Sequence, residues 1–136
     1  MYISEIVTTP PENISERVPL EQEVYKVFKK LGIPFERVDN DPASSMEECS
    51  DMSHMSFASP EHMWEHLGTK PGSASVVGLL NDEDDYVQLI IDKEVAEAEY
   101  FVCNTGINTT HLKFKTQDLL KKFLPYTHHR PRIVDL

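Results

Sequence analysis

Apolar residues recur at helical spacing near the start of the sequence. The positions are Leu20, Val24, Val27, Phe28 and Leu31. A period of three to four residues places them on one face of a helix, so the pattern predicts a helix over 19–31. Pro19 suits the first turn of such a helix, and Gly32 is the residue type that commonly ends one.

Shorter apolar runs and turn residues predict the remaining elements. Strands are expected over 35–39, 86–91, 99–103 and 111–114, with residues 133–134 at a sheet edge. Helix starts are expected at Ser44–Ser45, at Ser59–Pro60 and at Thr116, because each carries a capping residue or an early proline. The helix that starts at Ser59–Pro60 is expected to end at Gly68, and the helix that Thr116 caps is expected to run over 118–123. The Gly-, Ser- and Pro-rich stretch 70–78 predicts a tight loop.

The predicted strands and helices alternate irregularly, with no internal repeat and no βαβ rhythm. This order predicts an α+β (mixed α/β) fold, in which helices flank a curved mixed β-sheet. The length of 136 residues suits a single domain over 1–136. Residues 1–14, which include the run Thr8-Thr9-Pro10-Pro11, are expected to form a mobile N-terminal arm.

The charge balance argues against a protein that grips a nucleic-acid duplex by its phosphates. The chain has 13 Lys and Arg against 23 Asp and Glu, a net charge of −10, whereas such a protein needs a basic face. Basic residues gather in 26–30 and in the C-terminal third, so nucleic acid is expected to be met only at that end. We expect no DNA partner.

The apolar content and the cysteines of the sequence predict a cytoplasmic location. No apolar run approaches the ~20 residues that a membrane-spanning helix needs, so no membrane partner is expected. The first residues carry acids and lack the apolar core of a secretory signal. Cys49 and Cys103 form no CxxC pair, which favours a reducing cytoplasm without a disulfide framework.

Few side-chain patterns indicate chemistry without further context. His62 and His66 have a spacing that can hold a metal, but no third ligand is fixed, and exposed histidines explain the pair better. The acidic run 81–85 lacks the spacing of a calcium loop and reads as a solvated hairpin turn. Cys103 reads as a buried, inert thiol. We expect no metal and no cofactor.

A resemblance to a known family extends over nearly the whole chain in order. The matching segments are LGIPFERVDNDPASSMEEC (31–49), SFAS (56–59), PGSAS (71–75), GLLND (78–82), the strand 87–92, Asn108-Thr109 and the helix at 118–120. This pattern resembles the prolyl-tRNA-synthetase-associated editing domain, the YbaK-like aminoacyl-tRNA deacylases.

The resemblance implies a trans-editing hydrolase that cleaves the ester between a wrong amino acid and tRNA. It implies no metal, and its commonest substrate is alanine mischarged onto proline tRNA. The expected partners are a tRNA acceptor end carrying a small amino acid and prolyl-tRNA synthetase. Such editing makes physical sense, because a synthetase pocket rejects a smaller residue by only ~1–3 kcal/mol per methylene and a second, smaller pocket can exclude proline.

The resemblance also assigns a loop that polarises the substrate carbonyl. Residues 72–76 fall on the family's GxxxP loop, so Gly72 is expected to bring its backbone amide to the substrate as an oxyanion hole, with Ser75 lining the site. The final proline of the motif is Val76 here. From the residues alone, this stretch is also compatible with a simple turn.

The resemblance places further site residues after the next strand. Asn108 and Thr109 match a polar pair near the aminoacyl group, although an Asx-type turn explains GINTT equally well. Asn104 stands where many members carry a histidine, and an amide cannot shuttle a proton at neutral pH. The expected pocket walls are Phe35, Val38 and Leu79.

The family pattern also includes a segment that this sequence lacks. Members carry a lysine-bearing hairpin where only Ser50–Met55 stands here, and no lysine lies between Lys30 and Lys70. Either the chain is a shortened, catalytically impaired member, or residues are missing from the sequence near 50–53; the abrupt join favours the second explanation. Two other functions therefore stay open: a non-catalytic module that binds aminoacyl-tRNA, and a sensor of a free amino acid.

Overall fold

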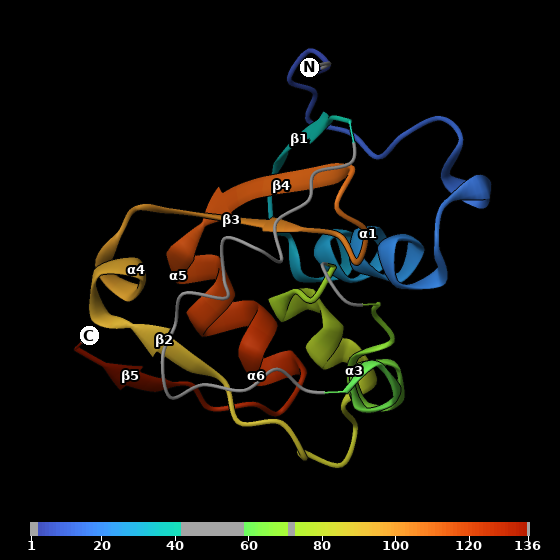
Figure 1. Cartoon of the computed structure of the whole chain (residues 1–136). Coiled ribbons are helices and arrows are strands. Elements are labelled where there is room, and N and C mark those ends of the chain that lie inside the picture. The colour runs from blue at the N-terminus through green and yellow to red at the C-terminus, as the bar shows by residue number, and fades with distance from the viewer. Residues whose placement is uncertain (1–2, 42–58, 71–72, 136) are drawn as a thin grey trace.

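The computed structural model describes residues 3–41, 59–70 and 73–135 (Figure 1). Its helical elements are η1 (Ile14–Glu16), α1 (Pro19–Leu31), α3 (Pro60–Leu67), η2 (Val76–Asn81), α4 (Lys93–Glu97), α5 (Thr116–Asp118), η3 (Leu119–Phe123) and α6 (Leu124–Tyr126). Its strands are β1 (Glu36–Asp39), β2 (Ile90–Asp92), β3 (Tyr100–Asn104), β4 (Thr110–Lys115) and β5 (Arg132–Val134). The expected α+β class is confirmed.

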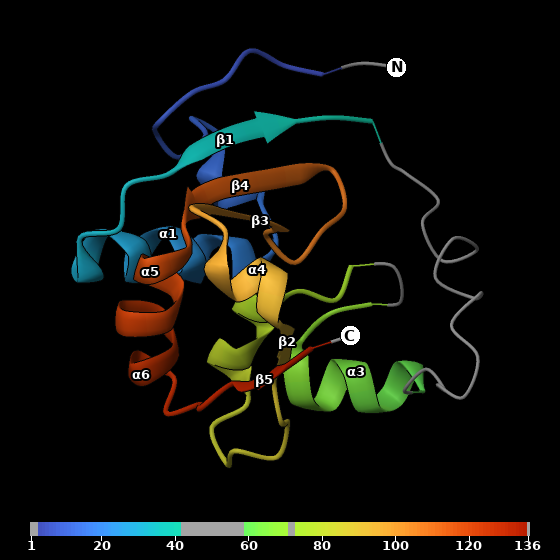
Figure 2. The same cartoon turned by 90° about the vertical axis from the view of Figure 1, so that its left-hand side faces the viewer.

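Two small sheets organise these strands. The larger has the order β1-β4-β3 with antiparallel neighbours, and the smaller pairs β2 with β5 in parallel. In both views, α1 and the continuous helix α5–η3–α6 lie below the larger sheet (Figures 1 and 2). Parallel and antiparallel pairings therefore occur in separate sheets in the described part of the chain.

Helix α1 has the bounds that the hydrophobic period predicts. Proline occupies its first turn, and Gly32 ends it in the left-handed conformation with φ 67°. Its apolar face packs under the sheet, where the ring of Phe28 meets Phe35, Phe114 and Phe123 edge-on at centroid distances of 5.9, 4.9 and 5.9 Å. Helix α1 is thus held by aromatic packing at the centre of the core.

The predicted helix over 59–68 is also confirmed. The Ser59 hydroxyl accepts a hydrogen bond from the His62 N–H at 3.2 Å, which caps α3 at its start. Gly68 ends the helix with φ 65°, and Asn81 Nδ2 donates to the Leu67 carbonyl at 2.9 Å. These contacts join α3 to η2, the segment that follows the 73–75 loop.

The C-terminal helix forms as expected but begins differently. Thr116 is its first residue rather than its cap, and Lys115 occupies the N-cap position without a side-chain bond. The Thr116 hydroxyl is buried and has no hydrogen-bond partner among the described residues, because strand β4 runs directly into the helix. Leu119, Phe123 and Leu124 of this helix are fully buried.

The strand predicted over 86–91 is wrong for most of its length. Only Ile90–Asp92 forms a strand, paired with β5. The N–H groups of Tyr86 and Val87 instead donate to the carboxylate of Asp82, at 3.1 and 2.7 Å. A side chain thus takes the donors that a neighbouring strand would have used.

A partly buried polar network fastens α1 to β1 and β4. Arg17 Nη1 donates to Thr110 Oγ1 at 2.8 Å and lies 3.2 Å from Asp39 Oδ1 and 3.4 Å from Glu21 Oε2. Burial raises the pKa of Glu21, although the Tyr25 hydroxyl and Arg17 act against this. Burial also acts to raise the pKa of Asp39, but hydrogen bonds from Thr110 and Arg17 lower it.

The N-terminal segment lies along β1. Val7 and Arg37 exchange two backbone hydrogen bonds of 3.0 and 2.6 Å, and the Ser4 N–H donates to the Asp39 carbonyl at 2.8 Å. Segment 3–7 therefore continues the sheet beyond β1, through isolated bridges. The mobility expected for the arm over 1–14 stays a prediction.

Several expectations fall on residues outside the described ranges. The helix expected at Ser44–Ser45 and the short interval at 50–55, where the family hairpin is missing, both lie in 42–58. The single-domain assignment over 1–136 stays a prediction. Within the described part of the chain, no helix combines the length and apolar character needed to cross a membrane.

Phe28→Ala tests the aromatic centre of the core. The Phe28 side chain is fully buried, so its truncation leaves a cavity, and we expect the free energy of unfolding to fall by about 4 kcal/mol. Urea denaturation measures the effect, with Val95→Ala at an exposed position as the control. Equal losses in the two variants would contradict this packing.

Candidate functional site

A row of three side chains crosses one face of the larger sheet. His111 on β4 pairs directly with Val38 on β1 and with Asn104 on β3. Directly opposed residues of antiparallel strands share a face, so the three side chains lie side by side. We call Val38, His111 and Asn104 the cross-strand row. The alternate residues Leu112 and Phe114 face the core.

The loop at 73–75 is fastened to one end of the cross-strand row. The Ser75 hydroxyl donates to the Asn104 carbonyl at 2.8 Å, and Asn104 Nδ2 donates to the Ala74 carbonyl at 3.4 Å. Asn104 Oδ1 also accepts from the Gly106 N–H at 2.8 Å. The Asn104 amide thus holds the loop in place beside the start of the β3–β4 turn.

The other side of the β3–β4 turn is held by Asn40, which follows β1. Its main-chain N–H donates to the Thr109 carbonyl at 2.8 Å, and its Nδ2 donates to the Asn108 carbonyl at 3.1 Å. Its Oδ1 lies 2.8 Å from Nδ1 of His111. Asn40 therefore connects the predicted polar pair, Asn108 and Thr109, with the middle of the cross-strand row.

The structure brings some predicted site residues together and separates others. Ser75, Asn104 and Val38 lie in or beside the cross-strand row, and Asn108 and Thr109 follow in the adjoining turn. Phe35 stacks on Tyr25 at 5.7 Å, on the core face, and Leu79 is buried in the core. Gly72 lies outside the described residues, so its expected oxyanion role stays a prediction.

Cys103 precedes Asn104 on β3, and its surroundings disfavour the reactive thiolate form. Burial raises the pKa of its thiol to about 12, although a contact with Ser75 acts to lower it. A thiol with so high a pKa is not ionised near neutral pH, and the thiolate is the reactive form. This agrees with an inert, partly buried cysteine.

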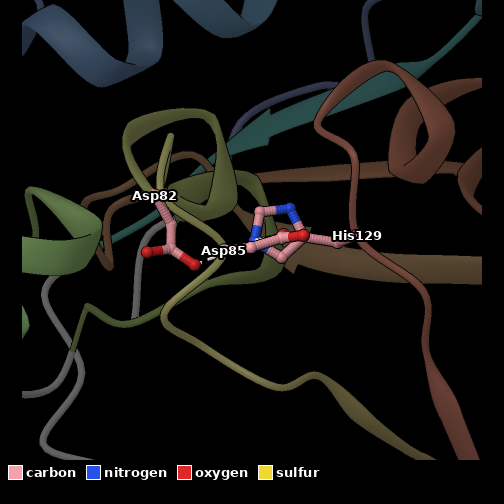
Figure 3. Close-up of side chains that lie close together, drawn as sticks. All are labelled: Asp82, Asp85 and His129. Carbon is pink, nitrogen blue, oxygen red and sulfur yellow. Dashed lines mark hydrogen bonds and ion pairs between the residues drawn. The ribbon is translucent and has the colours of Figure 1, made fainter.

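A second polar cluster consists of Asp82, Asp85 and His129 (Figure 3). His129 Nε2 lies 2.8 Å from Asp82 Oδ2 and 3.3 Å from Asp85 Oδ1. Asp82 is buried, so the acidic run 81–85 is not simply the solvated turn that the sequence predicts. This acid-histidine clasp, formed by Asp82, Asp85 and His129, ties the 82–87 segment to the chain after α6.

Hydrogen bonding explains the clasp without a metal ion. The Thr127 hydroxyl donates to the Leu124 carbonyl at 3.0 Å, so its oxygen accepts from Nδ1 of His129 at 2.9 Å. Nε2 pairs with Asp82 Oδ2 at 2.8 Å, so both ring nitrogens have a hydrogen-bond partner. The three ligand atoms lie within 4.8 Å of one another, a spacing that a cation could also use, but each already has a hydrogen-bond or ion-pair partner.

The clasp borders one of the pockets of the molecule. The pocket has a volume of about 250 Å³, and its lining includes Asp85, Tyr86, Gln88, His128 and Arg130. None of these residues belongs to the cross-strand row. The clasp and its pocket are therefore separate from the site that the sequence predicts.

A comparison with known protein families assigns the chain to one of them. The aminoacyl-tRNA editing domain family matches residues 46–122, more than half of the chain. The chain belongs to the aminoacyl-tRNA editing domain family. The matched range includes β3, β4 and the 73–75 loop. No curated protein matches the chain at a significant level.

Family membership sets the chemistry at a coarse level. The family is one of aminoacyl-tRNA editing domains, so membership supports aminoacyl-tRNA deacylation as the general class of function. Sequence reasoning missed Asn40 and His111 as parts of the site. The β-strand alternation alone would have placed His111 and Lys113 on one face, but their neighbours across the sheet depend on the register.

Asp82→Asn tests the acid-histidine clasp. The substitution removes the charge of a buried carboxylate that pairs with His129 and accepts from the N–H groups of Tyr86 and Val87, so we expect a loss of about 3 kcal/mol in unfolding free energy at pH 7. Urea denaturation of Asp82→Asn measures this loss, and Asp84→Asn, an exposed position in the same turn, is the control.

The stability loss in Asp82→Asn should also depend on pH. Burial acts to raise the pKa of Asp82, but hydrogen bonds from His129, Val87 and Tyr86 outweigh it and lower the pKa. The stability that this carboxylate contributes is therefore present above the unfolded-state pKa, near pH 4, and is lost as the pH falls through the folded-state pKa. The difference in unfolding free energy between wild type and Asp82→Asn should therefore become smaller below about pH 4. A difference that stays constant from pH 7 to pH 3 would contradict the hydrogen bonds described for Asp82.

Proposed function

We propose that this chain is a trans-editing deacylase that hydrolyses mischarged aminoacyl-tRNA, with alanyl-tRNA(Pro) as its substrate. The observation that carries the proposal is the attachment of the 73–75 loop to Asn104, within a chain of the editing-domain family. We place the aminoacyl group over the cross-strand row, between this loop and the turn that carries Asn108 and Thr109.

Two main-chain donors support a role of the loop in carbonyl polarisation. The N–H groups of Ala74 and Ser75 donate no hydrogen bond to any residue within 3–41, 59–70 and 73–135. Fixed, unpaired N–H groups stabilise the oxyanion that forms when water attacks an ester, because they need no reorganisation. In this proposal Asn104 is a positioning residue, since it holds the loop through the Ala74 carbonyl.

The proposed substrate also fits the charge of the protein. A domain with a net charge of −10 does not wrap a duplex, but recognition of one aminoacylated chain end needs few phosphate contacts. Lys113 lies exposed on the same face, one strand pair beyond His111, and is the nearest basic side chain of β4 to the cross-strand row. We propose prolyl-tRNA synthetase as a partner and the cytoplasm as the place of action, because both supply the mischarged tRNA.

A deacylation assay tests the proposal. Wild-type protein should release alanine from alanyl-tRNA(Pro) well above the spontaneous rate and should leave prolyl-tRNA(Pro) intact, because a small second pocket excludes the larger residue. A protein that binds alanyl-tRNA(Pro) without turnover would instead be a non-catalytic binding module. Binding of free alanine alone would indicate an amino-acid sensor.

Asn104→Ala tests the positioning of the loop. It removes the hydrogen bonds to the Ala74 carbonyl and the Gly106 N–H, so we expect kcat/KM for alanyl-tRNA(Pro) to fall by at least about tenfold. The control is Val102→Ala, an exposed position on the same face of β3. Circular dichroism checks that both variants are folded; an unchanged kcat/KM in folded Asn104→Ala would contradict the proposed role.

A further inference from the structure

His111 occupies the middle of the cross-strand row. It lies between Val38 and Asn104, and Asn104 in turn holds the 73–75 loop. The imidazole is half-buried, so it is partly shielded from water yet open to a ligand on this face. A substrate carbonyl held by the loop would therefore lie near this ring.

Asn40 fixes the tautomer of His111. Nδ2 of Asn40 donates to two main-chain carbonyls, those of Asp41 and Asn108, so the amide orientation leaves Oδ1 facing the imidazole. Oδ1 only accepts, so Nδ1 of His111 carries the proton in their 2.8 Å hydrogen bond. In the neutral ring, Nε2 then holds a free lone pair, and it makes no hydrogen bond to any described residue.

Burial favours the neutral ring. Desolvation lowers the pKa of His111 from its ordinary value, and no carboxylate within the described residues acts to reverse this. The charged side chains of β1 and β4 on the face of His111 are Glu36, Lys113 and Lys115, while Arg37 and Asp39 of β1 pair with the buried residues Leu112 and Thr110 of the core face. Asp41 follows β1, and Glu5 belongs to the arm. Lys113 lies over the ring of Tyr100 at 4.6 Å.

The other side chains of this face are poorer proton acceptors. An amide such as Asn104 cannot take a proton at neutral pH, and the Ser75 hydroxyl already donates to a carbonyl. Glu36 is exposed and pairs with Lys113, one strand pair further from the loop. His111 is thus the base that lies closest to the loop among the described residues of this face.

We propose that His111 is the general base of the deacylation, a role that rests on the proposed function. Nε2 takes a proton from a water molecule as the water oxygen bonds to the ester carbonyl carbon. The bond from that carbon to the ribose oxygen then breaks, and the imidazolium returns its proton to the ribose oxygen. The products are a free amino acid, whose carboxyl group releases its proton to solvent, and tRNA with an intact hydroxyl.

The test compares pH profiles of kcat/KM on alanyl-tRNA(Pro) between pH 5 and pH 7, with the spontaneous rate subtracted at each pH. Wild type should lose activity toward acid with a midpoint below about 6.5, the ordinary histidine value. His111→Gln should lose about 100-fold at pH 7 and should lack this acid limb. Glu36→Gln, on the same face, is the matched control and should keep both rate and profile.

The outcomes separate this proposal from the one on which it rests. A wild type that never exceeds the spontaneous rate refutes the deacylase function and the His111 role together. An active wild type, with His111→Gln within threefold of it or with the same acid limb, refutes the His111 role alone. A structural effect of the substitution is recognised by circular dichroism and by an acid limb that persists at lower activity.

A second measurement needs no activity. Long-range ¹H–¹⁵N spectra of the histidine rings report which nitrogen carries the proton. We expect His111 to be the neutral Nδ1–H tautomer at pH 7, and His62, an exposed histidine on α3, serves as the reference. An imidazolium or an Nε2–H tautomer at His111 would overturn the proposal.

Discussion

The pairing of β1 and β3 onto the two edges of β4 is the constraint on which the site depends. In the middle of β4, His111, Leu112 and Lys113 each have one partner on either side, and alternate residues face opposite sides of the sheet. Leu112 and Phe114 therefore enter the core, while His111 lies between Val38 and Asn104 on the other face. A shift of one residue of β1 or β3 along β4 would turn Val38 or Asn104 to the other face and break the cross-strand row.

Two sets of polar contacts maintain this register from opposite faces. On the core side, Arg17 joins α1 to Asp39 of β1 and to Thr110 of β4. On the other side, Asn40 and Asn104 fasten the turn and the 73–75 loop to the strand ends. The core-side contacts stabilise the fold without occupying the face where we place the substrate, which leaves that face available for chemistry.

The elements that the sequence predicted correctly are those formed by interactions between residues close together in the chain. Helix α1 follows from its apolar period, its early proline and Gly32, and α3 follows from Ser59 and Gly68, all within a few residues of sequence. The strand expected over 86–91 failed because the carboxylate of Asp82 takes the N–H groups that a partner strand would need. Apolar content alone carries no information about that competition.

Contacts distant in sequence were beyond prediction from one sequence. Asn40 and His111 are 71 residues apart, and Asp82 and His129 are 47 apart. The resemblance identified Asn104, Asn108 and Ser75, but only the register reveals that His111 lies beside Asn104. Phe35 and Leu79, expected as pocket walls, pack inward instead: Phe35 stacks on Tyr25 against the core, and Leu79 is buried on the inner side of η2.

The most direct measurement is amide chemical-shift mapping with a non-hydrolysable, amide-linked 3′-alanyl-adenosine. The account predicts perturbations centred on Val38, Ser75, Asn104 and His111. Perturbations centred on the acid-histidine clasp, or none at saturating analogue, would contradict the placement of the substrate on the cross-strand row.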